Sequence, residues 1–431
     1  MAVAPDDDDA RAVLAGLTKV AWRKGYRAAV EGCSSDGARA RVQSLYRALM
    51  TGRELDAARA DAAALVEPES GADAAVLRAG VGKQAHTLAR LARAMFALDE
   101  GRPLDAVEQL DWALLTGMDA ELVRVLERVD SARAAGANAG ADEPETEERV
   151  VVPTPDVDAA RRRLDLRAAD ELERVPAERL CVAEFASGHF ATGTPVLVAG
   201  AARGWPALDK WVDVRYFVRA CGHRIIPVEI GRSALKAGDG WREAGMRMRD
   251  FVAGHLLPSC AADLADRPLP AGSIGYCAQH QLFEHVRALA ADISVPVYCA
   301  AARGGVQLVN CWLGTRETAT PLHFDSYDNC LVQVVGLKLV RLYGKDQTPR
   351  LYAGVPNARA PAGADVDGGV GAQGNVSAVD VDAPDLGRFP LFARAEGRWC
   401  LLAPGDLLFI PAGCWHHVRS LSTSCSVNFW F

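Results

Sequence analysis

Two residues in the stretch TPLHFDSYDNCLVQVVGLKLVRLY, Thr320 to Tyr343, have the types and spacing of metal ligands. His323 and Asp325 are two positions apart, and alternate residues of a β-strand project to the same face. An imidazole and a carboxylate side by side, just after Pro321, can supply two adjacent ligands to one ion. The alternative is an exposed histidine and aspartate at a strand end, which these two residues alone do not exclude.

A second stretch, PGDLLFIPAGCWHHV, supplies a third ligand. It carries the pattern G-x5-P-x-G-x2-H through Gly405, Pro411, Gly413 and His416, and this pattern resembles the second motif of the cupin-type double-stranded β-helix. In that barrel the histidine faces the lumen and completes a metal site begun by an earlier H-x-D/E pair. Adjacent strand residues point to opposite faces, so only one of His416 and His417 can be the ligand. The motif spacing selects His416 and makes His417 an outward-facing or surrounding residue.

The donor set of His323, Asp325 and His416 favours iron over zinc. Two imidazoles and one carboxylate on one face of an octahedron leave three positions open, the arrangement used in non-haem Fe(II) oxygen chemistry. Zinc prefers a closed or nearly closed tetrahedral site. We therefore expect these three residues to be both the metal ligands and the catalytic residues of an Fe(II) site that also admits a bidentate acid and O2.

A lysine inside an apolar strand points to an acidic co-substrate. Lys338 lies between two leucines in VVGLKLVRLY, where burial of its ammonium is unfavourable unless the group meets an anion. We expect it to be the counter-ion of the distal carboxylate of 2-oxoglutarate. Tyr276, Thr320 and Asn329 offer hydroxyl and amide donors to complete that carboxylate's hydrogen bonds. The alternative is an edge-strand lysine whose ammonium reaches solvent.

The elements that position these residues fall into an α-helical part and a β-rich part. Residues 1–134 are rich in Ala, Leu, Arg and Glu, with apolar positions every three or four residues in segments that end near a glycine, as expected for amphipathic helices. We predict a helical bundle or repeat-like domain there, acting as a packing or protein-docking module. Residues 135–165, rich in Ala, Gly, Pro and acidic residues, are predicted to be a linker.

The rest of the chain, residues 166–431, has the pattern of a β-barrel. Short Val, Ile, Leu and Trp runs alternate with Gly and Pro turn signals, which favours a β-sandwich or barrel. A Gly- and Ala-rich insertion at 353–380 is predicted to be a mobile surface loop. The predicted fold class is therefore α+β: an N-terminal all-α domain followed by a double-stranded β-helix barrel with flanking helices.

Composition excludes several classes of protein. The 431 residues carry a net charge of −7 with eleven cysteines and no C-x-x-C pair, which argues against a polybasic nucleic-acid-binding or membrane-surface protein and against a structural zinc site. No apolar run is long enough for a transmembrane helix, and the acidic N-terminus does not resemble a signal peptide. We expect reduced thiols and a location in the nucleus, the cytoplasm or both.

From about Arg174 to Phe431 the sequence resembles the Jumonji-C oxygenases, in the branch of jumonji domain-containing protein five, also called lysine demethylase eight. The segments that carry the resemblance are GWPALDKW, SIGYCAQHQLFEHVRALAADISVPVYC, NCWLG, TPLHFDSYDNCLVQVVGLKLVRLY and FIPAGCWHHVRSLSTSCSVNFW. The resemblance implies Fe(II), 2-oxoglutarate and O2 as reactants. Its implied residues are His323, Asp325 and His416 for iron, Tyr276, Thr320, Asn329, Lys338 and Trp430 for 2-oxoglutarate, and Glu229, Gln279 and Trp312 for substrate.

The branch also implies a protein substrate. The expected reaction is hydroxylation of an arginine side chain on carbon, with release of succinate and CO2. One alternative is a lysyl demethylase that acts on methylated histone tails and releases formaldehyde. A different class of function is a non-catalytic interaction protein whose helical domain does the work on a barrel scaffold.

Overall fold

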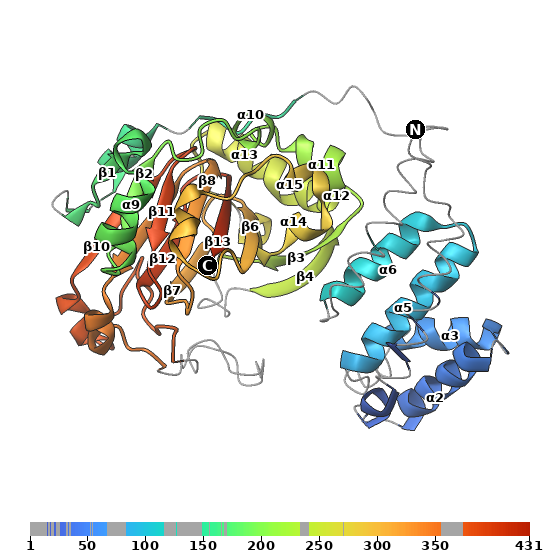
Figure 1. The fold of residues 1–431 in the computed structure, drawn as a ribbon. Coiled ribbons are helices and arrows are strands. Elements are labelled where there is room, and N and C mark those ends of the chain that lie inside the picture. The colour runs from blue at the N-terminus through green and yellow to red at the C-terminus, as the bar shows by residue number, and fades with distance from the viewer. Residues whose placement is uncertain are drawn as a thin grey trace. The chain divides into compact units, whose positions relative to one another are not determined.

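The computed structural model of the chain contains two compact units, Met1–Glu147 with His223–Ile225, and Glu148–Gly222 with Ile226–Phe431 (Figure 1). The structure describes residues 26–31, 36–51, 55–66, 83–115, 149–232 (without 155, 165, 168 and 169), 241–354 (without 270) and 374–431, together with residues 15, 18, 21, 22, 33, 53 and 126.

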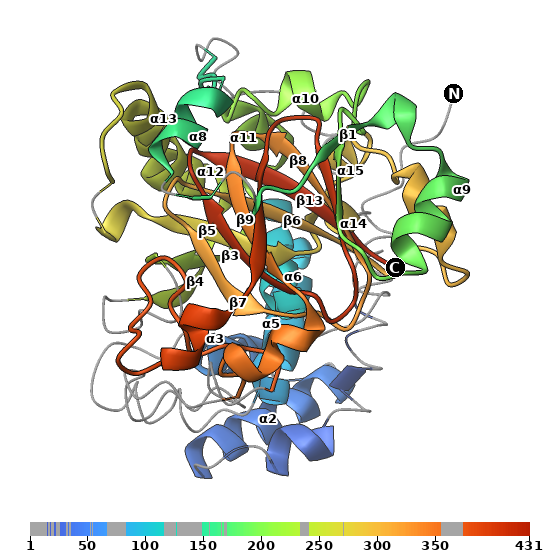
Figure 2. The same cartoon turned by 90° about the vertical axis from the view of Figure 1, so that its left-hand side faces the viewer.

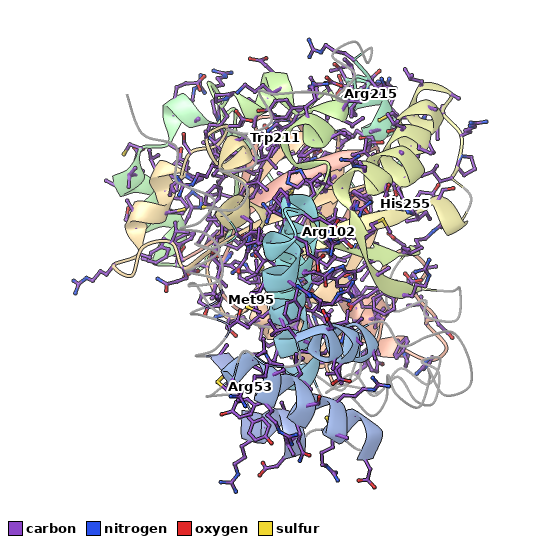
Figure 3. All side chains as sticks on the ribbon, turned by 90° about the vertical axis from the view of Figure 1, so that its right-hand side faces the viewer. Arg53, Met95, Arg102, Trp211, Arg215 and His255 are labelled. Atoms are coloured by element: carbon purple, nitrogen blue, oxygen red, sulfur yellow. The ribbon has the colours of Figure 1, made fainter. Side chains whose placement is uncertain are left out.

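The first unit is helical and its core is built from small and aliphatic side chains. Its described helices are α2 (Asp36–Thr51), α3 (Leu55–Val66), α5 (Lys83–Asp99) and α6 (Pro103–Leu115), and residues 26–31 are also helical. Alanines and leucines form most of the core, which lets neighbouring helices approach closely. Arg102 lies at the turn between α5 and α6 (Figure 3) and forms ion pairs with Glu100 and Asp105.

The second unit contains two β-sheets. One has nine strands in the order β1-β2-β11-β8-β13-β6-β5-β3-β4, and the other has four in the order β10-β9-β12-β7 (Figures 1 and 2). The strand bounds are β1 (Arg174–Pro176), β2 (Val196–Ala199), β3 (Ile225–Ile230), β4 (Arg242–Arg247), β5 (Gly275–His280), β6 (Leu308–Gly314), β7 (Ala319–His323), β8 (Asn329–Val335), β9 (Lys338–Tyr343), β10 (Gly397–Leu402), β11 (Leu407–Ile410), β12 (Trp415–Ser420) and β13 (Ser424–Trp430).

Helices pack against the outer face of the nine-stranded sheet, and Figure 1 shows several of them beside β6 and β3. Their bounds are α9 (Val182–Phe185), α10 (Ala207–Lys210), α11 (Arg215–Cys221), α12 (Met248–Phe251), α13 (Leu257–Leu264), α14 (Leu282–His285) and α15 (Arg287–Ala290). Trp211 is buried in this layer (Figure 3), where its indole N–H donates to Asp292 over 3.0 Å and its ring stacks on Phe283. Alternate residues of β8 and β13 face these helices as an apolar layer.

The space between the two sheets holds a second apolar core. Leu331 and Leu408 from the larger sheet meet Val340, Leu342 and Val418 from the smaller one. The remaining inner-face positions of β8 and β13 are polar. Because buried polar groups need hydrogen-bond partners, these inward positions define where a polar ligand site can lie.

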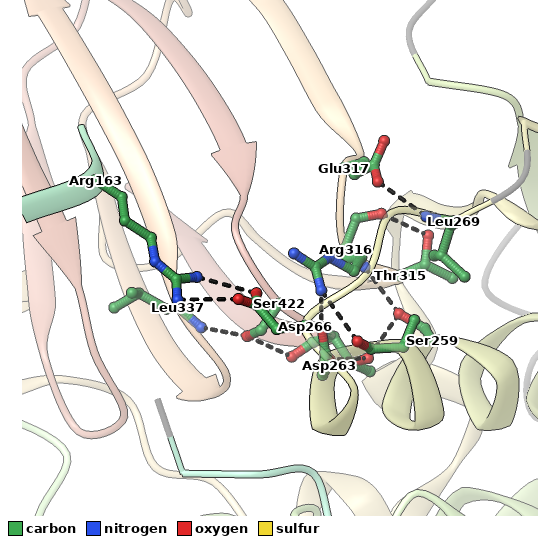
Figure 4. A network of polar contacts seen from close by, with 12 residues as sticks. Arg163, Ser259, Asp263, Asp266, Leu269, Thr315, Arg316, Glu317, Leu337 and Ser422 are labelled. Carbon is green, nitrogen blue, oxygen red and sulfur yellow. Dashed lines mark hydrogen bonds and ion pairs between the residues drawn. The ribbon is translucent and has the colours of Figure 1, made fainter. Parts of the chain in front are cut away.

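A polar network ties α13 to the turns that enter β7 and β13 (Figure 4). The Asp263 carboxylate lies 3.4 Å from the Arg316 guanidinium and accepts the Thr423 backbone N–H over 2.7 Å. The Ser259 hydroxyl accepts the Arg316 backbone N–H over 3.0 Å. These contacts fix the strand starts, and so they help to set where the side chains of β7 and β13 lie.

The predicted α+β architecture of a helical region followed by a cupin-type barrel is confirmed. Helix α8 (Val157–Arg163) lies inside the range predicted as linker, so that range is not wholly irregular. The rest of the predicted linker up to 148, and residues 355–373 of the predicted insertion, lie outside the described residues. All eleven cysteines are free thiols. No helix in the described part of the chain has the length and apolar character needed to cross a membrane.

Candidate metal centre

His323, Asp325 and His416 come together at one point between the two sheets. One potential ligand atom from each lies within 4.8 Å of the other two. The Nε2 atoms of the two histidines are 3.6 and 3.7 Å from the two oxygens of Asp325, and the imidazole rings are 4.2 Å apart. No other such group of three metal-ligating side chains exists among the residues that the structure describes. The arrangement has the donor atoms and the spacing needed to hold one metal ion.

A β-bulge next to Pro321 places the two histidines opposite each other. His416 pairs with His323 across β12 and β7, and the register shifts before the next pair, Val418 with Thr320. Proline has no N–H to donate to the ladder, so it is tolerated in strands at edges and bulges. β7 ends at His323. Asp325 therefore follows the strand instead of continuing it, which differs from the simple two-residue alternation expected from the sequence.

The loop that carries Asp325 is held by backbone hydrogen bonds on both sides. Gly413 donates its N–H to the Asp325 carbonyl over 2.8 Å. Its φ of +76° suits glycine and strains any other residue, and a Cβ there would also lie 2.4 Å from the far end of the Lys345 side chain, which would have to move aside. On the other side, the Phe324 N–H donates to Asn375 over 3.0 Å. Gly413 of the G-x5-P-x-G-x2-H motif thus fixes the loop of Asp325, a ligand from the H-x-D motif.

The imidazoles are oriented by their other nitrogen. His323 Nδ1 lies 2.8 Å from the Pro321 carbonyl, and His416 Nδ1 lies 3.1 Å from the Cys414 carbonyl. An Nδ1–H that donates to a carbonyl leaves Nε2 with a lone pair directed at the metal position. Burial, together with nearby His323, lowers the pKa of His416 to about 4, so its neutral, metal-binding form is present at neutral pH.

His417 faces the opposite side of β12. Its Nε2 lies 3.8 Å from Asp382, whose carboxylate also contacts Arg341 and Arg419. His417 lines a separate cavity with a volume of about 440 Å³, which His416 does not line. The sequence assignment of the two histidines to opposite faces agrees with this geometry.

Lys338 lies deep in the cavity that contains the three metal-binding side chains. It is 1% exposed, and its Nζ is 3.4 Å from the Tyr276 hydroxyl, which in turn hydrogen bonds to Thr320. No carboxylate pairs with Lys338 in the described part of the chain. Burial lowers the pKa of this lysine to about 8. The edge-strand alternative therefore does not fit, because the ammonium is enclosed and lacks an anion.

Asn329, which is predicted to bind the same carboxylate, takes part in a second group of hydrogen bonds. It lines the same cavity, and its side chain hydrogen bonds with Asn428, whose Nδ2 donates to Asn329 Oδ1 over 3.3 Å. Asn428 also accepts the Trp312 indole N–H over 2.7 Å. The cavity therefore has two polar groups, one of Lys338 with Tyr276 and Thr320, and one of Asn329 with Asn428 and Trp312.

The substrate-binding candidates are spread around this cavity. Trp312 lines it, and its ring centre lies 5.9 Å from that of Tyr276. Glu229 pairs with Tyr276 across β3 and β5, so both side chains project to the same face. Burial raises the pKa of Glu229 to about 7, and its one described hydrogen bond is a 3.4 Å contact from the Trp241 indole N–H.

Glu229 is not among the residues that line the cavity, and neither are two further candidates. Gln279 is exposed, has a φ of +46° and lies at a register shift between β5 and β6. Trp430 is buried, and its ring stacks on Tyr327 with centres 5.6 Å apart. The backbone of Trp430 pairs with Asn329, so it is next to the cavity but not on its wall.

Sequence reasoning missed Asn428 and Trp241. The segment SCSVNFW alternates Ser, Ser, Asn and Trp with Cys, Val and Phe, and a polar stripe along a buried strand is a signal that could have identified Asn428. Trp241 follows a Gly-rich stretch outside any recognisable strand pattern. Only the fold brings it to Glu229.

Comparisons with known proteins agree with this geometry. The profile of the cupin-like domain family matches residues 182–431, more than half of the chain. The chain belongs to the cupin-like domain family. JmjC domain-containing protein F of Dictyostelium discoideum is 35% identical over 280 residues, which cover 57% of this chain and 59% of that protein. Lysine-specific demethylase 8 of Xenopus tropicalis is 35% identical over 249 residues, which cover 57% of this chain and 50% of that protein.

A more distant Jumonji-C relative carries a hydroxylase name. The human protein named bifunctional peptidase and (3S)-lysyl hydroxylase JMJD7 is 27% identical over 249 residues, which cover 55% of this chain and 77% of that protein. Demethylase and hydroxylase names thus both occur among the Jumonji-C relatives. The chain spans between half and three fifths of the length of the first two relatives.

Proposed function

We propose that the protein is an Fe(II)- and 2-oxoglutarate-dependent oxygenase that hydroxylates an arginine side chain of a protein substrate. The observation that carries the proposal is the buried Lys338 ammonium. It is enclosed in the same cavity as three metal-binding side chains, and no carboxylate of the described residues pairs with it. A buried cation that lacks an anion destabilises the fold. A buried lysine of this kind is expected at a binding site, where a ligand supplies the negative charge.

The residues present fit both the metal and the acid. Bound iron would supply the oxidation of a C–H bond with O2, coupled to decarboxylation of 2-oxoglutarate to succinate and CO2. His323, Asp325 and His416 would hold it. Lys338 would bind the distal carboxylate, with Tyr276 and Thr320 donating to the same group. The cavity is narrow, with a volume of about 30 Å³, and Lys338 and Tyr276 line it together.

Glu229 supports a cationic substrate. Its carboxyl is largely buried, and the charge of Glu243, which has the same sign, raises its pKa further. No cationic partner of Glu229 occurs in the described part of the chain. A guanidinium would satisfy this carboxylate and could stack on the nearby Trp241 indole, because arginine is planar and favours aromatic faces.

A lysyl demethylase is the second candidate. Relatives named lysine-specific demethylase 8 are 34–35% identical to this chain. Trp241 contacts Glu229, Tyr276 pairs with it across β3 and β5, and Trp312 lies against Tyr276. Aromatic rings around a cation are the way in which methylated ammonium groups are bound. This grouping was not evident from the sequence, and it favours the demethylase more than the sequence alone did.

Mass spectrometry of peptides separates the two reactions. Enzyme with Fe(II), 2-oxoglutarate and ascorbate should add one oxygen atom to an arginine peptide and release no formaldehyde from a methyl-lysine peptide. Formaldehyde from methylated histone peptides, with no oxygen added to arginine, would assign the demethylase instead. His323→Ala serves as the inactive control in both assays.

A non-catalytic role on a barrel scaffold predicts a different result. Binding partners would then depend on the helical unit, and His323→Ala would leave the cellular function intact. We also propose that the helical unit docks protein partners, that nucleic acid and membranes are not bound directly, and that the protein acts in the nucleus or the cytoplasm. Pull-down with the full chain, comparing the wild type with His323→Ala, tests the first of these.

A further inference from the structure

The cavity that His417 lines on the outer face of β12, here called the outer cavity, is rich in arginine. Its volume is about 440 Å³. Six of the side chains that line it are arginines or acidic residues: Arg232, Arg316, Arg419, Glu317, Asp380 and Asp382. Their formal charges cancel, so these groups, unlike Lys338, do not depend on a ligand for their charge balance.

The three guanidiniums have N–H groups to spare. Each carries five N–H groups on three nitrogens, yet only one nitrogen of each pairs with a side chain in the described part of the chain. These contacts join Arg232 to Glu317, Arg419 to Asp382 and Arg316 to Asp263, the last of which Figure 4 shows. The Nε atoms of Arg316 and Arg419 are buried without an acceptor among the described residues. A ligand that meets this lining is therefore expected to bring acceptor oxygens.

Two of the carboxylates that line the outer cavity are already engaged. Asp382 contacts two arginines and His417. Glu317 accepts the Leu269 backbone N–H over 3.0 Å and also pairs with Arg232. The lining thus offers more donors than acceptors, and a carboxylate, whose two oxygens match the fork of a guanidinium, fits that imbalance.

One edge strand separates the outer cavity from the metal centre. β7 is the last strand of the four-stranded sheet. Thr320 and His323 of this strand line the cavity that contains the metal-binding side chains, whereas Ala319 and Pro321 line the outer cavity. The two cavities therefore lie on opposite faces of the same edge strand.

The end of β3 leads from the proposed arginine site to the outer cavity. Glu229 lies on β3, which ends at Ile230, and Arg232 lines the outer cavity. The Arg232 carbonyl accepts the Ala319 N–H of the edge strand over 3.1 Å. The three residue steps from Glu229 to Arg232 span at most about 10 Å. The Arg232 side chain is 48% exposed, so a polypeptide bound at the surface can reach it.

We propose that the outer cavity is a second subsite for the protein substrate, and that it binds the carboxylate of an aspartate or glutamate about three residues from the target arginine. This proposal rests on the proposed function, in which Glu229 holds the target guanidinium. An extended chain advances about 3.3 Å per residue, so three residues match the distance between the two sites. The subsite selects the sequence around the target and takes no part in the chemistry at the metal.

Peptides with one arginine test the proposal. A host peptide of alanine, glycine and serine carries a fluorescent label and one glutamate, placed one to six residues before or after the arginine, and a matched series carries glutamine instead. Fluorescence anisotropy measures their binding to the full chain with Mn(II) and 2-oxoglutarate. We expect glutamate about three residues away, on one side of the arginine, to bind about tenfold more tightly than glutamine, the effect of one hydrogen-bonded charge pair.

Turnover provides a second readout of the same peptides. With Fe(II) and ascorbate, mass spectrometry of the added oxygen gives kcat and KM for each glutamate and glutamine pair. The preference for glutamate should be found in KM and not in kcat, because the subsite binds the chain away from the reacting carbon.

Arg419→Gln removes one of the guanidiniums while Asp382 keeps Arg341 as a partner, and it should reduce the preference for glutamate from about tenfold to nearly one. Arg398→Gln is the matched control. It removes the same charge from an exposed residue of β10, the strand at the opposite edge of the same sheet, and it should keep the full preference. Arg232→Gln decides the question if the Arg419 variant does not fold.

Two results would overturn the proposal. One is equal affinity for the glutamate and glutamine peptides at every spacing, or no binding of any of them, in the wild type. The other is a preference that persists in both Arg419→Gln and Arg232→Gln. Failure of the proposed function has a different signature, since no oxygen would then be added to any arginine peptide, whichever residue it carries beside the arginine.

Discussion

On the inner face of β12, His416 points to the metal position, whereas one residue later His417 points to the outer face and its own cavity. The two histidines are equally buried, at 4% exposed, and burial is the main cause that lowers the pKa of each to about 4. Their neighbours differ. His417 contacts Asp382, which already pairs with Arg341 and Arg419, so the charged groups of the outer face satisfy one another.

The inner face holds ionisable groups whose partners are missing. Lys338 has no carboxylate partner among the described residues, and the three metal-binding side chains direct their ligand atoms at a common point. Burial and a shifted pKa are thus shared by both faces and do not separate structural from functional residues. What separates them is whether the charges of each face are already paired, since unpaired buried charges require a ligand.

The largest effect is expected from the metal-binding side chains. His323→Ala, Asp325→Ala or His416→Ala removes one of three protein ligands, and we expect metal affinity to fall by more than about 100-fold, beyond what loss of a supporting residue causes. Metal titration and 2-oxoglutarate turnover measure this. A His416→Ala protein that turns over normally while His417→Ala is inactive would reverse the assignment of the two faces.

Lys338→Met should have the next largest effect: it should weaken 2-oxoglutarate binding but stabilise the ligand-free protein. Removing the partner of a buried carboxylate costs about 3–5 kcal/mol, so 2-oxoglutarate affinity should fall by at least about 100-fold while metal binding persists. In the ligand-free protein the substitution should raise the free energy of unfolding by on the order of 3 kcal/mol, because the folded-state pKa of this lysine lies well below its unfolded value.

Calorimetry and chemical denaturation measure the two quantities for Lys338→Met. Lys345→Met is the matched control, since it removes the same charge from an exposed lysine and should change neither quantity. An unchanged affinity for 2-oxoglutarate would place Lys338 outside the binding site.

The pH dependence of binding should differ between the two ligands. Lys338 in the free protein loses its proton as the pH rises through about 8, so 2-oxoglutarate affinity should decrease above that pH, by up to about tenfold per pH unit. Glu229 loses its proton near pH 7, so the affinity for an arginine peptide should increase as the pH rises through 7. Calorimetry at a series of pH values tests both, and parallel curves for the two ligands would contradict the assignment.

The smallest effect is expected on the outer face. His417→Ala leaves Asp382 with Arg341 and Arg419 as partners, so we expect a loss of about 1–2 kcal/mol in the free energy of unfolding. Activity and metal affinity should stay near those of the wild type. Thermal unfolding with a parallel turnover assay measures this, and a loss of metal binding would show that the outer face supports the ligands directly.

Much of the site was predictable because it depends on local spacing. The H-x-D pair, the second-motif histidine and a lysine between leucines each break an apolar strand pattern in a way that requires a ligand. The bulge at Pro321, which sets His323 opposite His416, was not predictable, because register depends on two strands that are distant in sequence. The same reason hid Asn428, which contacts Trp312 and Asn329 in other strands.

The bonds that hold the loop after His323 also have a practical consequence. Asn375 accepts from Phe324, Val376 accepts from Gly354, and Ser377 donates to Leu322, so both sides of the segment 355–373 are joined to the metal-binding strand. Chain added between fixed ends changes the free energy of unfolding little, by about 0.6 kcal/mol per doubling of length. An affinity tag or a fluorescent label inserted in this segment should therefore leave the pocket intact and provide an attachment point beside it for immobilisation or distance measurements.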